Sequence, residues 1–219
     1  MRPLSMLEAR ALGVLVEKSL TVPDSYPLSL NSLTLGCNQK TARDPVIAAS
    51  EAEVQLAVDA LKTLSLAFES SGSRVARYEH NLGRALALPS QSVALLATLI
   101  LRGPQTAAEL RTAAERLHRF ADVSAVEGFL DELAARPAEK GGALVLKLPR
   151  APGAREQRWA HLLSGPVDVS ALPAAADGDA FVATSELASL KLRMAATEAE
   201  VARLASLVER LCRDLDVRP

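Results

Sequence analysis

Apolar residues in the first part of the chain recur at helical spacing and are interrupted by prolines. Ser5 and Glu8 match a capping box, in which two side chains satisfy free backbone N–H groups at a helix start, and an apolar face follows them. This pattern predicts a helix over about residues 5–20. Beyond the prolines, a shorter apolar pattern predicts a second helix over about residues 29–37.

A third helix and a hairpin complete this pattern. Ser50 and Glu53 form another capping box, and the apolar positions after them fit a helix face at i, i+3, i+4 and i+7. Leu66–Phe68 and Arg74–Tyr78 are predicted strands around a Ser-Ser-Gly-Ser turn. Three helices followed by a β-hairpin is the order of a winged helix, which we predict for residues 1–88.

The same order recurs over residues 89–164. Ser90–Leu101 has the pattern of an apolar helix, Thr106 opens a capping box for a helix to about Phe120, and Asp122 caps a further helix. A second hairpin follows. We therefore predict a mainly α fold with small β-hairpins, an α+β class, made of two tandem winged-helix domains.

The two predicted hairpins end in similar sequences. Residues 77–82 are RYEHNL and residues 158–163 are RWAHLL, so arginine, an aromatic residue, histidine and leucine recur in the same order. This similarity indicates an internal duplication. We expect His80 and His161 to be strand-end histidines bonded to the backbone, because no carboxylate or cysteine cluster that would make a metal or proton-transfer site accompanies either.

The composition and the hydrophobic spacing change in the last part of the chain. Residues 165–183 are rich in alanine, aspartate, glycine and proline, which predicts a flexible linker. Over residues 184–216, apolar residues are spaced alternately by three and four, the period of a coiled coil. β-branched residues at a positions and leucine at d positions favour a parallel dimer, and the alternative is that this helix packs on its own chain. The predicted dimerisation residues are Leu187, Leu190, Met194, Val201, Leu204, Val208, Leu211 and Leu215.

Composition narrows the classes of partner. Hydrophobic residues make up 49% of the chain and charged residues 23%, as in an ordinary globular protein. A net charge of −1 and an aromatic content of 3% argue against a broadly basic nucleic-acid surface and against base stacking. Cys37 and Cys212 lie far apart, so we expect reduced thiols and a cytoplasmic location. We expect no membrane segment, metal or cofactor, since no apolar run or ligand spacing indicates one.

Several segments resemble a known family. Residues 7–46, LEARALGVLVEKSLTVPDSYPLSLNSLTLGCNQKTARDPV, are similar to the opening of the YceH-like family of uncharacterised bacterial proteins. The segments SEAEVQLAVDAL at 50–61, SRVARYEHNLG at 73–83 and LRGPQTAAELR at 101–111 are similar to it as well. The resemblance covers about residues 1–163 and implies two winged-helix domains. It implies no catalytic residues, cofactor or substrate.

The polar stretch GCNQKTARDPV, residues 36–46, allows two interpretations. Its side chains are types that bond phosphate oxygens, so together with the first predicted wing it is a candidate nucleic-acid contact. Alternatively it only turns the chain, with Asn38 closing the preceding helix and Arg43 paired with an acid. We favour the turn. The candidate nucleic-acid-binding residues are Lys40, Thr41, Arg43, Arg74 and Arg77.

Charge on the predicted third helices argues against the usual winged-helix mode of DNA binding, in which that helix enters the major groove. Their outward faces are acidic, with Glu51, Glu53 and Asp59 in the first and Glu127, Asp131 and Glu132 in the second. Other cations, Arg111, Arg116 and Arg119, lie on the predicted middle helix of the second domain. Such acidic faces are better suited to a protein partner than to phosphate.

The sequence favours a non-enzymatic protein. It has no GxGxxG, Walker, HExxH, CxxC or GxSxG motif, and its three histidines have no nucleophile or carboxylate at a diagnostic spacing. We expect a dimeric DNA-binding or regulatory protein. The alternative is a protein–protein interaction adaptor that uses the acidic third helices.

Overall fold

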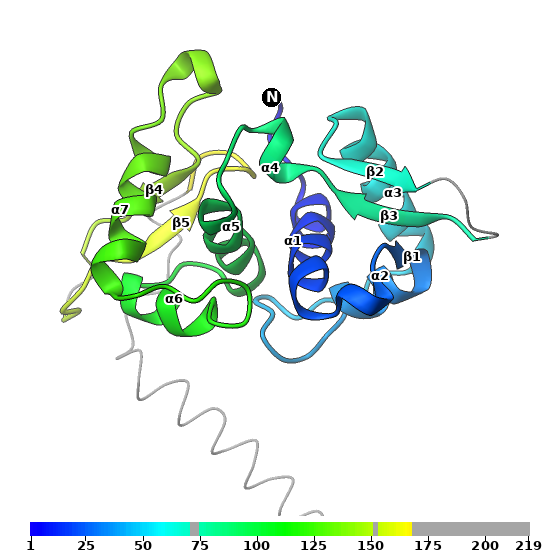
Figure 1. The fold of residues 1–219 in the computed structure, drawn as a ribbon, viewed down its shortest axis with the longest axis horizontal. Coiled ribbons are helices and arrows are strands. Elements are labelled where there is room, and N and C mark those ends of the chain that lie inside the picture. The colour runs from blue at the N-terminus through cyan, green and yellow to red at the C-terminus, as the bar shows by residue number, and fades with distance from the viewer. Residues whose placement is uncertain (71–74, 151–152, 168–219) are drawn as a thin grey trace, which may run out of the picture. The chain divides into compact units, whose positions relative to one another are not determined.

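The computed structural model describes residues 1–70, 75–150 and 153–167, and confirms a mixed α+β fold. The chain divides into two compact units, the first made of Met1–Arg150 and Arg155–Leu172. The elements below belong to this first unit (Figure 1). They are α1 (Met6–Thr21), β1 (Leu28–Ser29), α2 (Leu30–Cys37), α3 (Glu51–Thr63), β2 (Ala67–Ser70), β3 (Arg77–His80), α4 (Leu82–Ala85), α5 (Ser90–Arg102), α6 (Ala107–Ala113), α7 (Val123–Ala134), β4 (Val145–Lys147) and β5 (Trp159–His161), with short 3₁₀ turns at Pro23–Ser25 and Ala138–Lys140.

The central helix α1 is buried on all sides over much of its length. Every residue from Glu8 to Val16 is buried, although a surface helix would show an exposed face every few residues. The reason is that α1 packs against α2, α3 and β3 and also against α5. Its start is fixed by the predicted capping box, since Ser5 Oγ accepts from the Glu8 N–H and the Glu8 carboxylate accepts from the Ser5 N–H.

The first hairpin belongs to a three-stranded antiparallel sheet in the order β1-β3-β2. Leu28 pairs with Tyr78 across β1 and β3, and Ala67 pairs with His80 across β2 and β3. The two-residue strand β1 was not predicted, because its apolar pattern is too short to separate from the helix that follows. The hairpin itself was predicted, with its strands placed a few residues early.

The second half repeats this arrangement with one difference in its middle helix. β4 and β5 form an antiparallel pair, and a β-bridge joins Gln105 to Trp159 where β1 joins β3 in the first half. The prediction of a helix from Thr106 to about Phe120 is wrong in its length, since α6 ends at Ala113. Turns follow it, and they carry Phe120 into an edge-on contact with Phe129 of α7 in the core.

The two halves also repeat individual hydrogen bonds. Arg77 Nη1 donates to the Pro27 carbonyl at 2.8 Å, and Arg158 Nη1 donates to the Pro104 carbonyl at 3.0 Å. The residues after the two histidines correspond as well, because Asn81 N–H donates to Leu66 O and Leu162 N–H donates to Leu144 O. The sequence repeat at 77–82 and 158–163 therefore occupies the same structural place twice.

One continuous core joins the two halves, and its centre is the contact of α1 with α5. Gly13 lies so close to α5 that an added Cβ would stand 2.9 Å from Ile100 Cγ2 and 3.0 Å from Leu101 Cδ2. Two backbone bonds reinforce the junction, from Leu4 N–H to Leu163 O and from Asp44 N–H to Leu101 O. The division into domains 1–88 and 89–164 stays a prediction, because the two segments share this core.

The C-terminal predictions fall outside the described residues. These are the linker 165–183 beyond residue 167, the coiled-coil helix 184–216, and the heptad residues Leu187, Leu190, Met194, Val201, Leu204, Val208, Leu211 and Leu215.

The close approach at Gly13 gives a first prediction. Replacing a helical glycine with alanine normally adds about 1 kcal/mol of stability. Gly13→Ala should instead lower the free energy of unfolding by about 1–2 kcal/mol, because the new methyl group overpacks the β-branched Ile100. Urea unfolding followed by circular dichroism measures this change.

Gly128→Ala is the matched control. Gly128 lies within α7, and an added Cβ there meets nothing within 4 Å, so this substitution should stabilise the protein. Equal stabilisation by both substitutions would show that α1 and α5 are not in close contact.

Candidate functional site

The loop at residues 36–46 is tied to the fold at both of its ends. The Asn38 side chain makes a pair of bonds with Ala49, accepting from its N–H and donating to its carbonyl, both at 2.8 Å. At the other end, the Asp44 N–H donates to the carbonyl of Leu101 in α5. The loop therefore turns the chain between α2 and α3 and also reaches the second half of the fold.

Arg43 points into the protein. Its side chain has no exposed surface, and its Nη2 lies 2.6 Å from Glu17 Oε2 of α1. The same guanidinium donates to the carbonyls of Gly36 and Ala42 and to Gln39 Oε1. All of these partners are internal, so Arg43 is occupied in holding the loop, as the turn interpretation expects, and it has no free edge for a phosphate.

Arg10 is a second buried arginine beneath the loop, and its role was not predicted because its partners lie far along the chain. It is 2% exposed and donates to the carbonyls of Cys37 and Pro45 at 3.2 and 2.6 Å. Burial and the neighbouring Arg43 lower the pKa of Arg10. The Cys37 thiol beside it is buried too, which raises its pKa to about 12 and keeps it protonated and unreactive at neutral pH.

The other predicted phosphate contacts that the structure describes are exposed, unlike Arg43. Lys40 and Thr41 are exposed on the loop, and Arg77 is exposed on β3 with one bond to the Pro27 carbonyl. Arg74 lies outside the described residues. The structure therefore separates the buried Arg43 from the exposed members of the predicted set.

The His80 ring is bonded differently from the prediction. His80 Nε2 lies 3.1 Å from Ser19 Oγ, a side-chain hydroxyl and not a backbone group. Because Ser19 Oγ donates its hydrogen to the Val16 carbonyl, it must accept from His80 Nε2–H, and the ring nitrogen cannot act as a base toward this serine. His161 is half-buried, and the loss of solvent around its ring lowers its pKa to about 4, so the ring is neutral at pH 7.

The outward face of α3 is acidic and also carries an exposed leucine. Glu51, Glu53 and Asp59 are exposed, and Leu56 between them is 71% exposed. The cation on this face, Lys62, bonds Glu69 of β2 at 2.6 Å and approaches Asp59 at 3.5 Å. The face therefore presents negative charge around one large apolar side chain.

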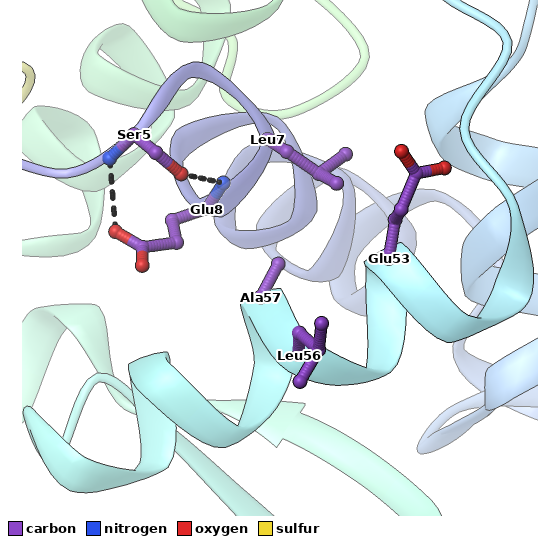
Figure 2. Close-up of a pocket in the computed structure, with 6 residues that line it drawn as sticks. All are labelled: Ser5, Leu7, Glu8, Glu53, Leu56 and Ala57. Atoms are coloured by element: carbon purple, nitrogen blue, oxygen red, sulfur yellow. Dashed lines mark hydrogen bonds between the residues drawn. The ribbon is translucent and has the colours of Figure 1, made fainter.

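An open groove of about 250 Å³ lies between this face and the start of α1. Figure 2 shows Leu7 of α1 above α3, with Glu53, Leu56 and Ala57 on the α3 side of the groove. Met6, beside Leu7 in α1, is 55% exposed. The Glu8 carboxylate at the end of the groove is bonded by Arg2 at 2.8 Å, so its charge is already compensated. The sequence did not predict Leu56, Met6 or this groove as a site. The sequence alone does not reveal which apolar side chains on a helix are left exposed to solvent.

The equivalent helix in the second half is acidic too. Glu127, Asp131 and Glu132 of α7 are exposed, as the sequence predicted. The arginines Arg111, Arg116 and Arg119 are exposed on α6 and the turns after it, where Arg111 donates to the Ala121 carbonyl.

Two further findings concern the described residues. In them, no group of three or more histidine, cysteine, aspartate or glutamate side chains is placed to hold a metal ion. No helix among them combines the length and hydrophobicity needed to span a bilayer.

Comparison with known proteins identifies the family. A family model described as "Protein of unknown function, DUF480" matches residues 4–154. The chain belongs to this family. It is 63% identical to a UPF0502 protein of Leptothrix cholodnii over 219 residues, covering 99% of this chain and 97% of that one. It is 58% identical to a UPF0502 protein of Acidovorax sp. over 216 residues, covering 99% and 96%. The predicted membership of an uncharacterised bacterial family is thus confirmed.

The Arg43–Glu17 pair gives a prediction with a defined pH dependence. Burial alone would raise the pKa of Glu17, but the bonds from Arg43 outweigh it and the net pKa is lowered. A lowered pKa means that the pair stabilises the fold above the unfolded-state pKa, about 4.3, and that this contribution is lost as pH falls through the lower folded-state value. Glu17→Gln should therefore cost about 2–4 kcal/mol at pH 7, because it leaves Arg43 buried without a counter-charge.

Urea unfolding at a series of pH values tests this expectation. The difference between wild type and Glu17→Gln should shrink as pH falls below about 4. Glu115→Gln, at an exposed position on the turn after α6, is the control and should have no effect. A Glu17→Gln deficit that is the same at pH 7 and at pH 3 would contradict the role of the ion pair.

Proposed function

We propose that this protein is a non-enzymatic interaction adaptor, built from two tandem winged-helix modules, which binds a protein partner through the outward face of α3. The observation that carries the proposal is the exposed Leu56, surrounded by carboxylates and beside the groove at α1. A large apolar side chain at the centre of a polar rim is the usual anatomy of a protein-binding surface.

The element order supports the winged-helix assignment. In the first half, α1, α2 and α3 are followed by the hairpin β2–β3, and β1 adds a third strand. In the second half, α5, α6 and α7 are followed by β4–β5, and Gln105 takes the place of β1. The repeated bonds of Arg77 and Arg158 support a duplication of one module.

The charge of the α3 face favours a basic and apolar partner. Glu51, Glu53 and Asp59 would repel the phosphates of a DNA groove, and Lys62 is already paired with two acids. The same carboxylates attract lysine and arginine, while Leu56, Leu7 and Met6 provide apolar area for one or two partner side chains. We therefore expect the partner segment to carry an apolar residue flanked by cations.

Binding of DNA through the first module is a second candidate, favoured by the surroundings of Arg77. In the second half, the equivalent Arg158 bonds Glu109 Oε1 at 3.1 Å. The position equivalent to Glu109, three residues after the helix cap, is Ser32 in the first half, and among the described residues no carboxylate is paired with Arg77. Lys40, Thr41 and Arg77 are the exposed residues that would contact the phosphates.

We also propose that residues 184–216 form a parallel two-stranded coiled coil that pairs two copies of the chain. The heptad spacing supports this proposal, as does the charge pattern beside the seam, where Glu186 and Arg193 would face Lys191 and Glu198 of a second copy. Pairing two copies would present two α3 faces together and raise the apparent affinity for a repeated partner.

Selection from a displayed library of random 12-residue peptides tests the adaptor function. Wild-type protein should enrich peptides with an apolar residue flanked by lysine or arginine. Leu56→Asp should weaken binding of a selected peptide by about 20-fold or more in a titration, because it places a charge at the centre of the contact. Asp59→Lys should weaken it as well and reduce the salt dependence of binding.

Leu35→Asp provides the matched control. Leu35 is 64% exposed on α2, so it undergoes the same substitution at a similar exposure away from the groove, and it should leave peptide binding unchanged. Equal losses for Leu35→Asp and Leu56→Asp, or no enrichment by wild type, would refute the α3 site.

Light scattering coupled to size-exclusion chromatography tests self-association. Wild type should elute with about twice the 23.2 kDa mass of one chain. The double substitution Leu204→Lys and Leu211→Lys should return the mass to that of one chain, because it places charges at consecutive d positions. A wild-type mass of 23.2 kDa at micromolar concentration would contradict the coiled coil.

A further inference from the structure

The second hairpin concentrates positive charge. Over residues 144–158 the chain carries Lys147, Arg150, Arg155 and Arg158 against one acid, Glu156. The first hairpin differs, since over residues 66–80 its sequence carries Arg74 and Arg77 against Glu69 and Glu79. The second hairpin is therefore basic, whereas the first is balanced in charge.

Only part of this positive charge is used inside the fold. Arg158 bonds the Pro104 carbonyl and Glu109, which ties the base of the hairpin to the start of α6. Lys147 lies with its Nζ 5.2 Å from the centre of the Trp159 ring and is exposed. Arg150 and Arg155 are both exposed, and among the described residues no carboxylate lies within ion-pair distance of either one or of Lys147.

These cations flank the connection between β4 and β5, whose base is held by hydrogen bonds. β4 ends at Lys147, and the hydrogen bond from Leu148 N–H to Arg158 O continues the pairing beyond the strand. Gln157 Nε2 also donates to the Leu148 carbonyl. Arg150 lies three residues after the end of β4, and Arg155 lies four residues before the start of β5.

We propose that the exposed cations on either side of the β4–β5 connection, Lys147, Arg150 and Arg155, bind the phosphate backbone of duplex DNA. This surface is separate from the α3 face, and the proposal does not depend on the protein-binding function. Guanidinium groups bond phosphate oxygens in bidentate geometry, and the major groove admits a two-stranded β-ribbon.

The apolar residues of the hairpin exclude two other anionic partners. Single strands are bound by stacking bases on exposed aromatic rings, but Trp159, the aromatic residue of this hairpin, is 1% exposed. Membrane surfaces are bound by basic segments with apolar side chains that enter the lipid, but Leu148 is buried. Leu146, at 38% exposure, lies on the opposite face of β4 from Lys147, because side chains alternate along a strand. The remaining feature is a set of cations without a stacking or inserting residue, which suits a duplex backbone.

The acidic face of α7 limits how the duplex can lie. Glu127, Asp131 and Glu132 are exposed on this helix, so it cannot enter the major groove without repulsion. The hairpin must therefore bind the duplex by itself. Binding should be weak, independent of base sequence and governed by about three phosphate contacts.

Fluorescence anisotropy with a labelled 24-base-pair DNA duplex of mixed sequence tests the proposal in the full chain. The logarithm of the binding constant should fall with the logarithm of salt concentration with a slope of about −3 between 50 and 200 mM. The double substitution Arg150→Glu and Arg155→Glu should weaken binding at 50 mM salt by about 50-fold or more and reduce the magnitude of the slope to about 1.

Arg84→Glu with Arg102→Glu is the matched control, because both arginines are exposed, lie on α4 and α5, and change the net charge by the same amount. This control should change duplex affinity by less than about 3-fold, which excludes a general effect of net charge. Circular dichroism melting should show that all variants fold, since every substituted side chain is exposed.

Four results would overturn the proposal. One is wild-type binding that is absent or insensitive to salt. Another is an equal loss of affinity in the hairpin and control variants. The third is loss on Arg77→Glu but not on the hairpin substitutions, which would place the DNA contact in the first module. Binding of vesicles containing anionic lipid, without binding of the duplex, would also refute it.

Discussion

The fold depends on the close contact of α1 with α5 at Gly13. Gly13 lets the two helices approach until Ile100 and Leu101 fill the space that a Cβ would need. Because α1 already packs on α2, α3 and β3, this second contact buries the helix on all sides from Glu8 to Val16. Each half would otherwise leave an apolar helix face exposed to water. The halves therefore repeat one another in pattern but share a core.

The loop between α2 and α3 shows how buried charge can serve the same junction. Arg43 and Arg10 would be costly to bury alone, and they are tolerated because Glu17 and several loop carbonyls accept their hydrogen bonds. These bonds hold the loop in the position from which the Asp44 N–H reaches Leu101 of α5. The polar residues of the 36–46 loop thus serve mainly to bond the backbone internally. Lys40 and Thr41 are residues of this loop whose side chains are exposed.

Features that depend on neighbours in the sequence could be predicted, and features that depend on distant partners could not. The capping boxes at Ser5, Ser50 and Thr106 were predicted and are all formed, since each needs only four consecutive residues. The end of α6 was missed because Phe120 is drawn away by Phe129, and β1 was missed because two residues have no periodicity. For the candidate sites, the acidic outward faces of α3 and α7 could be predicted, because helical spacing alone shows which residues share a face. The burial of Arg43 required its partner Glu17, which lies 26 residues earlier.

The repeat of one arrangement in both halves allows two different surfaces on one scaffold. Arg77 and Arg158 occupy the same place, but among the described residues Arg158 has a carboxylate, Glu109, within bonding distance and Arg77 has none. Hydrogen bonds from the arginines repeated in the two halves, Arg77 and Arg158, to backbone carbonyls hold each hairpin in place. Exposed residues can therefore change without loss of the fold. In the first half the exposed positions include an apolar residue, Leu56, in an acidic face, and in the second they include cations beside the β4–β5 connection that have no carboxylate partner among the described residues. The proposed protein-binding face and the proposed phosphate-binding cations are compatible with one another because opposite charges lie on different elements, where each remains available to a partner.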